Sequence, residues 1–357
     1  MAKAYDDELV ALRRDVHAHP ELGRAEVRTT RVLRERLELA GLRPRPLPAG
    51  TGLICDVGEG RPAIGLRADI DALPVEDVKD VSYRSTVDGV CHACGHDVHL
   101  AAVLGAGLVL ADLDREGRLP GRVRLVFQPA EELTPGGALD VLAASGAEGL
   151  DRIFALHCDP RTEVGKVGVR TGAITAAADE VVVRLHGPGG HTARPHLTAD
   201  LVYALGAVIT GLPAALSRRV DPRSGLSVVW GRVRAGAASN AIPRAGEVAG
   251  TLRCLDQSVW QRAPELVAEL VTALVAPYGV AADIDHRRGV PPVVNDASSA
   301  RMLAAAAREV EGPDAVVVAE QSLGGEDFAW FLHRMPGMLA RLGVAAPADA
   351  EVGPPRP

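Results

Sequence analysis

The fold is decided by the stretch Cys91-His92-Ala93-Cys94-Gly95-His96-Asp97-Val98-His99 and by the apolar segment that continues from it. Residues 98–113 are apolar enough to predict a buried helix. Short apolar runs at 63–68 and 123–127 stand on either side and have the length and boundaries of strands. A strand, a helix and a second strand in this order are typical of a mostly parallel sheet covered by helices.

The same alternation of strands and helices extends in both directions along the first half of the chain. The spacing of apolar residues predicts two helices within 5–40, separated by a turn at His19-Pro20-Glu21, where proline interrupts the pattern. Further strands are expected at 53–57, 153–156 and 167–170, and a short helix at 137–145. The sequence therefore predicts an α/β domain with helices on both faces of the sheet.

From about Ala176 the pattern of elements changes. The expected order is strand, helix, strand, strand, helix, strand, at 180–186, 200–218, 227–234, 247–255, 257–278 and 280–286. This order is the split-βαβ pattern of a ferredoxin-like α+β domain. The α/β texture then returns, with helices at 297–310 and 326–332 and strands at 315–318 and 338–344. We therefore expect a discontinuous catalytic domain, 1–174 and 288–357, with an inserted domain at 175–287.

Composition excludes several classes of protein. The 357 residues are 47% hydrophobic and 24% charged, and the net charge is −7, which gives no basic surface for nucleic acid or an anionic membrane. The longest uncharged run, 201–217, contains two glycines and a proline, so a buried helix is expected rather than a membrane span. The N-terminus has no apolar signal segment, and the five cysteines are expected to be reduced thiols in a cytoplasmic protein.

The stretch 91–99 permits three kinds of site. Cys91 and Cys94 could form a redox dithiol, but no thioredoxin-like context precedes them. A structural zinc site would need a second closing pair at similar spacing, and none follows. In an open catalytic metal site, Cys94 and His96 could face one ion from either side of a tight turn at Gly95.

Three more strand ends carry side chains of the same chemistry. Glu131 and Glu132 follow strand 123–127, His157 follows strand 153–156, and Asp69 and Asp71 follow strand 63–68. Each feature alone is usually a solvated loop. Because ligands collect at the carboxyl ends of parallel strands, the four together favour a metal site in which one carboxylate binds the ion and another serves as base.

At these residues the sequence resembles the M20 metallopeptidase family, in particular its amidohydrolase branch. The segments that carry the resemblance are RRDVHAHPELG from Arg13, LRADIDALPVED from Leu66, HACGHDVHLAAVLGA from His92, FQPAEE from Phe127, ALH from Ala155, GPGGHTARPH from Gly187, SNAIP from Ser239, GTLR from Gly250 and GGEDFAWFL from Gly324. They occur in the family's order over nearly the whole chain.

The resemblance implies a centre of two divalent metal ions, zinc, manganese, cobalt or nickel. The metal ligands would be Cys94, His96, Glu132 and His157. Glu131 would be the general base that activates water, and Asp71 the acid that supports the site.

The resemblance also assigns roles in the inserted domain, which would serve as a lid and in dimerisation. His191 would reach the partner subunit's site of a homodimer and stabilise the oxyanion. Asn240 and Arg253, together with Glu326 from the closing part of the catalytic domain, would bind the substrate.

One departure from the family pattern concerns the end of the sequence. Family members present a further histidine and a long closing helix after the strand that matches 338–344. Here no histidine follows His333, and four prolines lie in the last eleven residues, which excludes a helix there. The resemblance therefore leads us to expect that one of the two metal positions is weakened.

The function implied is metal-dependent hydrolysis of the amide bond of N-acyl amino acids, aromatic or aliphatic. Two alternatives stay open: a catalytically impaired relative that acts only as a binding protein, and a dipeptidase. The sequence does not identify the acyl group, the amino acid or the metal, because side chains from unplaced loops form the pocket.

Overall fold

The computed structural model describes residues 2–346, which form two compact units. The first unit contains the chain up to Ile174, Val293–Glu320 and the residues from Asp327 on, and the second contains Thr175–Pro292 and Gln321–Glu326. The sequence placed the insertion at 175–287 and all of 288–357 in the first unit. The structure extends the insertion to Pro292, because its last strand continues to Val290. It also adds the segment Gln321–Glu326, where Ser322 bridges to Thr175 and the Ala176 amide donates to the Gly324 carbonyl.

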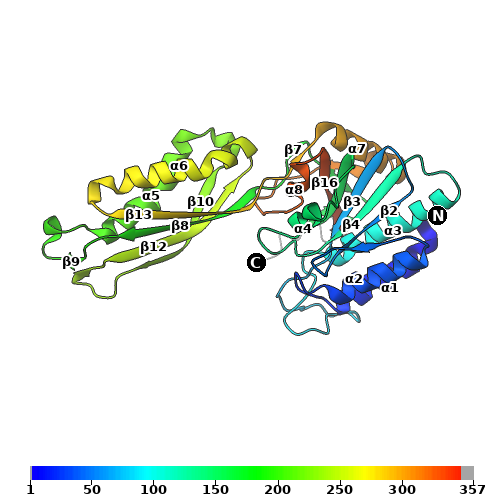
Figure 1. Ribbon diagram of the computed structural model, residues 1–357, viewed down its shortest axis with the longest axis horizontal. Helices are drawn as coiled ribbons and strands as arrows, with labels where there is room; N and C mark the ends of the chain where they lie inside the picture. Colours follow the sequence, from blue (N-terminus) through cyan, green and yellow to red (C-terminus); the bar gives the residue numbers. More distant parts are fainter. Residues whose placement is uncertain (1, 347–357) are drawn as a thin grey trace. The chain divides into compact units, whose positions relative to one another are not determined.

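An eight-stranded sheet organises the first unit (Figure 1). Its strands, in spatial order, are β1 (Arg45–Pro46), β2 (Leu53–Val57), β4 (Arg122–Gln128), β3 (Ala63–Asp69), β5 (Arg152–Glu163), β16 (Gly337–Ala345), β6 (Val167–Val169) and β15 (Val316–Val318). The central strands β4, β3, β5 and β16 pair in parallel, as does β6 with β15. The sheet is thus mostly parallel, as predicted.

Helices pack on both faces of this sheet. They are α1 (Asp6–Ala18), α2 (Val27–Leu39), α3 (His96–Arg115), α4 (Ala138–Ala143), α7 (Ala297–Glu311) and α8 (Ala329–Leu332). On β4, Leu125 and Phe127 pack with Leu104 of α3, whereas Val126 packs with Val141 of α4 on the other face. This alternation follows from the two-residue period of a strand and produces the predicted α/β/α sandwich.

Two elements of the first unit differ from the sequence prediction. Strand β5 continues to Glu163 instead of ending near residue 156, because β16 pairs with it over most of that length. His157 therefore lies within a strand and not at its end. Helix α8 begins at Ala329 instead of 326. The Asp327 carboxylate before it accepts hydrogen bonds from the side-chain amide of Gln128 and the backbone amide of Ala138.

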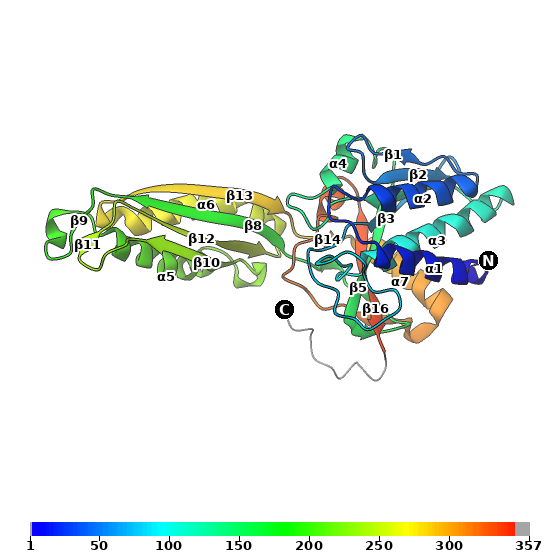
Figure 2. The same ribbon diagram turned by 90° about the horizontal axis from the view of Figure 1, so that it is seen from below.

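The second unit is a four-stranded antiparallel sheet with two helices on one face (Figure 2). Its elements are β8 (Ala177–His186), α5 (Leu201–Arg219), β10 (Ser227–Ala235), β12 (Ala245–Cys254), α6 (Gln257–Val275) and β13 (Ala281–Val290), and the spatial order of its strands is β10-β12-β8-β13. Two short ribbons complete the structure: β9 (Gly190–His191) pairs with β11 (Ala241–Ile242), and β7 (Gly172–Ala173) with β14 (Val294–Asn295).

Helices α3 and α5 are long and apolar enough to cross a membrane by length and composition alone. In α3, 56% of the apolar window is buried inside the protein, and in α5 33%. Helix α5 buries one face, which includes Leu205 and Leu212, and exposes Val202 and Tyr203. The prediction of a buried helix at 201–217 is therefore correct only for that face.

Short 3₁₀ turns occur at Ala2–Tyr5, Pro195–Leu197, Pro222–Ser224, Ala276–Tyr278 and Pro313–Ala315. The closing residues 347–357, to which the expectation of a missing histidine and helix refers, lie outside the described residues.

Candidate metal centre

A tight turn before α3 brings Cys94 and His96 to the same side. Gly95 has φ of 85°, in the left-handed region, and is the residue before the first helical residue. A β-carbon at this position would lie 2.9 Å from Sγ of Cys158, so both the backbone conformation and the contact with β5 require glycine. The turn therefore fixes the first two candidate ligands.

Three candidate ligands converge at this turn. One donor atom each from Cys94, His96 and Glu132 lie within 4.8 Å of one another. His96 Nε2 is 3.8 Å from Glu132 Oε1. Both of these atoms are buried, and neither makes a hydrogen bond within the described part of the chain. Buried polar atoms without partners are costly, and a bound cation would satisfy both.

Asp71 holds two of these ligands in place. Nδ1 of His96 donates to the Asp71 carbonyl at 2.9 Å, so in the neutral form of the ring, the form that binds a metal, the lone pair is on Nε2. The Asp71 carboxylate accepts the Glu132 amide at 3.0 Å through Oδ2. The acid expected to support the site therefore contacts the backbone of one ligand and the ring of another, as outer partners of metal sites commonly do.

His157 lies nearby but outside this close group. Its ring centroid is 6.3 Å from that of His96, and Nδ1 donates to the Cys158 carbonyl at 2.8 Å. Burial, together with the neighbouring His99 and Arg341, lowers the pKa of His157 to about 3. The ring is therefore neutral, with its lone pair on Nε2, the form in which histidine binds metals.

The electrostatics of the centre favour a cation. Burial opposes a charge on His96, but Asp69, Asp71 and Glu132 outweigh it and raise its pKa to about 10. Burial in turn raises the pKa of the Glu132 carboxyl. Thiolate, imidazole and carboxylate together suit zinc and the later first-row divalent metals. The residues present therefore fit a divalent metal centre.

Of a buried network behind the ligands, only Asp69 was predicted as part of the site. The carboxylate of Asp69 accepts His99 Nδ1 at 2.6 Å and Arg67 Nη1 at 2.7 Å, and His99 Nε2 accepts the Cys158 amide. Arg67 also donates to Asp327 at 2.7 Å. His99 and Asp327 stand inside the motifs that point to the site, but neither has a signal of its own that separates it from a core residue.

Glu131, the expected base, lies beside the ligand group. Its Oε2 is 3.9 Å from His96 Nε2, and its side chain is 9% exposed. The adjacent Glu132 turns to the ligand group, so the two neighbouring carboxylates occupy different positions. Glu131 therefore lies next to the group of Cys94, His96 and Glu132 but is not part of it.

The remaining predicted residues belong to the second unit. His191 on β9 pairs with Ala241, the residue after Asn240, so these two predicted residues lie close together. Arg253 pairs with Ala178 at the opposite end of the sheet from Ala245, which pairs with His186. The structure therefore groups His191 with Asn240 and separates both from Arg253. Glu326 is buried at the end of the segment Gln321–Glu326.

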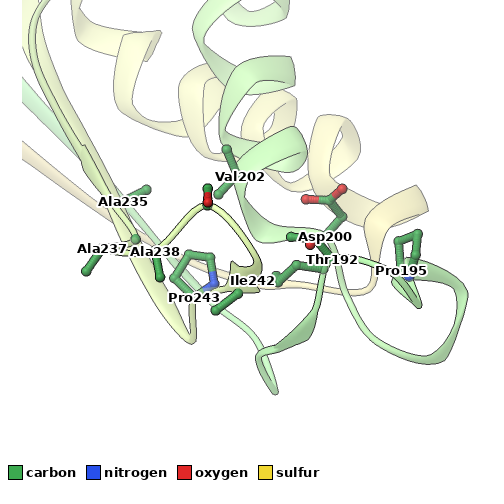
Figure 3. Close-up of a pocket in the computed structure, with 12 residues that line it drawn as sticks. Thr192, Pro195, Asp200, Val202, Ala235, Ala237, Ala238, Ile242 and Pro243 are labelled. Atoms are coloured by element: carbon green, nitrogen blue, oxygen red, sulfur yellow. The ribbon is translucent and has the colours of Figure 1, made fainter.

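The exposed ring of His191 has a defined tautomer. Its Nδ1 accepts the Ala193 amide at 3.1 Å, so the neutral ring carries its proton on Nε2. A cavity of about 520 Å³ lies beside this ribbon (Figure 3). Small and apolar residues line most of it, among them Ala235, Ala238, Ile242 and Pro243. Asp200 also lines it, and its carboxylate caps α5 by accepting the Tyr203 amide.

The mostly parallel sandwich thus carries a cluster of cysteine, histidine and glutamate that could hold a metal ion, and a split-βαβ unit is inserted into it. Residues 65–352 match the peptidase family M20/M25/M40, and the chain belongs to this family. The resemblance expected from the sequence motifs is confirmed.

Related proteins include amidohydrolases. The N-acetylcysteine deacetylase of Bacillus subtilis is 37% identical over 345 residues, which cover 96% of this chain and 90% of that protein. An IAA-amino acid hydrolase of Arabidopsis thaliana is 34% identical, over 95% of this chain and 77% of that protein. A protein of Rhodococcus jostii named as a glutamate–cysteine ligase is 51% identical, and the chain spans only 42% of its length.

A solved structure shares the fold. A Bacillus subtilis protein described as a dinuclear metal-binding peptidase of the M20 family superposes with a TM-score of 0.84 and 35% identity, over 96% of this chain and 89% of that one. The candidate ligand group therefore belongs to a fold in which a related protein binds two metals.

Proposed function

We propose that this chain hydrolyses the amide bond of N-acyl amino acids with the help of two divalent metal ions. The observation that carries the proposal is the close group of Cys94, His96 and Glu132, two of whose buried donor atoms lack hydrogen-bond partners within residues 2–346. Cys94, His96, Glu132 and His157 would hold the ions. When bound, the ions would polarise the amide carbonyl and make water more acidic, which an unreactive amide requires.

Glu131 would act as the general base. It lies beside His96 and would accept a proton from water as the oxygen attacks the carbonyl carbon. It would then give that proton to the nitrogen as the carbon–nitrogen bond breaks, so that an acid and an amine leave. Asp71 would not touch the substrate, because its contacts are with His96 and the Glu132 amide. It would position them.

The second unit would supply contacts to the substrate. His191 presents Nε2–H as a donor, which suits stabilisation of the developing oxyanion. Asn240, Arg253 and Glu326 would contact the amino-acid part of the substrate. His191 and Asn240 lie at the opposite end of the second unit from Arg253. We therefore propose a homodimer in which His191 and Asn240 contact the substrate at the metal centre of a second copy.

The relatives guide the choice of substrates. Their names include deacetylation of N-acetylcysteine and hydrolysis of indole-acetyl amino acids, so both the small and the aromatic acyl groups deserve testing. The first experiment is a panel of N-acetyl, N-benzoyl and indole-acetyl amino acids with N-acetylcysteine among them, plus unblocked dipeptides. The protein is stripped of metal and then supplied with zinc, manganese, cobalt or nickel.

We expect hydrolysis that requires added metal and falls about 100-fold or more in Glu131→Gln. Glu309→Gln, an exposed glutamate on α7, is the matched control and should retain full activity. Hydrolysis of dipeptides in preference to the N-acyl compounds would identify a dipeptidase instead. Folded protein that binds metal but cleaves no member of the panel would contradict the proposal and favour a binding protein.

A further inference from the structure

A strained residue immediately precedes the two glutamates of the centre. Ala130 has φ of 54°, a left-handed conformation that only two other non-glycine residues share in the described chain. Its side chain is fully buried. For a residue with a β-carbon this conformation is unfavourable and persists only where the surroundings hold it. The direction in which Glu131 and Glu132 leave the end of β4 depends on this residue.

A buried carboxylate holds Ala130 in this conformation. Oε1 of Glu26 accepts the Ala130 amide at 2.7 Å, across 104 positions of sequence. On the other side, the Gly137 amide donates to the Ala130 carbonyl at 2.9 Å. A β-carbon on Gly137 would lie 1.9 Å from the Pro129 carbonyl oxygen, so the backbone at Gly137 packs tightly against that of Pro129. Ala130 is therefore bonded through both its amide and its carbonyl.

Helix α2 does not require the Glu26 carboxylate. Glu26 is the residue before the first residue of α2, but its side chain makes no capping hydrogen bond. Glu21 serves that purpose, because its carboxylate accepts the amides of Arg28 and Thr29 and the Thr29 hydroxyl. The first turn of the helix is thus satisfied by another acid.

The burial of Glu26 disfavours folding by itself. The residue is 0% exposed, and burial raises the pKa of its carboxyl, opposed by hydrogen bonds that include the Ala130 amide. Apolar residues of similar size are commonly better tolerated at buried positions than a carboxylate. Glu26 is buried, and its hydrogen bond holds a strained residue next to Glu131 and Glu132. This arrangement indicates that Glu26 helps to position the two glutamates.

We infer that Glu26 is a positioning residue, which holds Ala130 in the left-handed conformation and thereby sets the directions of Glu131 and Glu132. This inference rests on the proposed roles of Glu131 as base and Glu132 as metal ligand. Glu26 is also hydrogen-bonded to the side chain of Thr51, but its link to the two glutamates is the hydrogen bond to the Ala130 amide. Its effect should therefore vanish when residue 130 can adopt the left-handed conformation unaided, as glycine does.

The test compares Glu26→Ala, Glu26→Gln, Ala130→Gly and the double variant Glu26→Ala/Ala130→Gly. Glu26→Ala/Ser145→Gly is the matched control, because Ser145 has φ of 57° and lies away from the two glutamates in sequence. Three quantities are measured on the full chain: hydrogen exchange of the Ala130 amide, affinity for Co²⁺ by equilibrium dialysis, and kcat and KM for the best substrate of the panel.

We expect Glu26→Ala to accelerate exchange at Ala130 and to weaken Co²⁺ affinity by about 10- to 100-fold, as loss of a ligand's outer partner does. Activity should fall in kcat more than in KM. Glu26→Gln keeps an acceptor oxygen and should stay near the wild type in all three. Ala130→Gly should restore Co²⁺ affinity and kcat in the Glu26→Ala background, whereas Ser145→Gly should not.

Unchanged Co²⁺ affinity and kcat in Glu26→Ala would overturn the inference, and so would equal recovery by Ser145→Gly. Where Glu26→Ala does not fold, a folded double variant with Ala130→Gly and wild-type Co²⁺ affinity supports it, and a folded double variant without that affinity overturns it. If the wild type binds no metal and cleaves no substrate, the proposed function fails. Exchange at Ala130 then decides separately whether Glu26 holds the backbone.

Discussion

At the residue scale, Cys94 distinguishes the candidate centre from a cluster of acids and histidines. A thiolate bound to Co²⁺ gives a sulfur-to-metal charge-transfer absorption, which carboxylates and imidazoles do not produce. We expect this absorption in the Co²⁺-loaded wild type and its loss in Cys94→Ser. Cys158 is the control, because its Sγ lies 3.9 Å from the Gly95 carbonyl but is not in the ligand group. Absorption that disappears only in Cys158→Ser would show that Cys158, and not Cys94, binds the metal.

A second residue-scale prediction concerns stability in acid. Asp56 on β2 and Arg124 on β4 form a two-pronged ion pair with both distances 2.7 Å. Burial opposes ionisation of Asp56, but Arg124 outweighs it and lowers the pKa of Asp56. The ionised acid therefore favours the folded state. This contribution is present above the ordinary aspartate pKa of about 3.9 and is lost as the pH falls through the lower folded-state pKa.

We expect Asp56→Asn to reduce the free energy of unfolding at pH 7 by about 2 kcal/mol, the value of a hydrogen-bonded charged pair. The difference from the wild type should shrink as the pH falls below 4. Urea unfolding between pH 7 and pH 3 measures both effects. Asp114→Asn, at an exposed position of α3, should change neither. A deficit that stays constant with pH would show that the charge of Asp56 is not the cause.

At the scale of elements, the glycine before α3 serves both the backbone conformation of the turn and the positions of Cys94 and His96. Gly95 and Gly117 bracket the helix, and both have positive φ. A β-carbon would meet Cys158 Sγ at 2.9 Å from Gly95 but nothing within 4 Å from Gly117. We expect Gly95→Ala and Gly117→Ala each to destabilise the protein by about 1–3 kcal/mol through backbone strain. Only Gly95→Ala should also weaken Co²⁺ binding.

Thermal unfolding and equilibrium dialysis on the same preparations separate the two effects. A Gly117→Ala protein that loses metal as readily as Gly95→Ala would mean that general destabilisation, and not the position of Cys94 and His96, sets the affinity.

The elements that the sequence predicted well are those marked by a nearly continuous run of apolar residues. Strand β2 and helix α3 matched their expected ranges closely because apolar residues alone mark them. Strand β5 was predicted too short, because its second half, from His157 to Glu163, is polar and owes its strand conformation to pairing with β16. The hydrogen bond from Ala130 to Glu26 was not predictable, since it joins residues 104 positions apart and leaves no local pattern.

At the scale of the whole molecule, the division of the predicted residues between the units leads to a test of the proposed dimer. Glu131 belongs to the first unit and His191 to the second. If His191 acts on the centre of a second copy, a mixed dimer of Glu131→Gln and His191→Ala subunits contains one intact site and one doubly defective site. If His191 acts within its own chain, no intact site can form.

We expect each variant to be nearly inactive alone and their equimolar mixture, after subunit exchange, to regain about a quarter of wild-type activity. This value follows because half of the dimers are mixed and each has one of two sites intact. Mixing Glu131→Gln with Cys94→Ser, both in the first unit, is the control and should restore nothing. Failure of the first mixture to recover, with exchange verified, would contradict action between subunits.

The ribbon of β7 and β14 has a consequence for how this molecule could have arisen. Ile174 and Val293, the two residues of the first unit that flank the main insertion, are joined by a hydrogen bond of 2.9 Å. The separation of the two ends is that of neighbouring strands in a hairpin, which a turn of two residues could close. Gain of residues 175–292, the larger part of the second unit, would therefore have required one event between Ile174 and Val293, without rebuilding the sheet. Selection could then vary that insertion while leaving the candidate ligands Cys94, His96 and Glu132, which all belong to the first unit, unchanged.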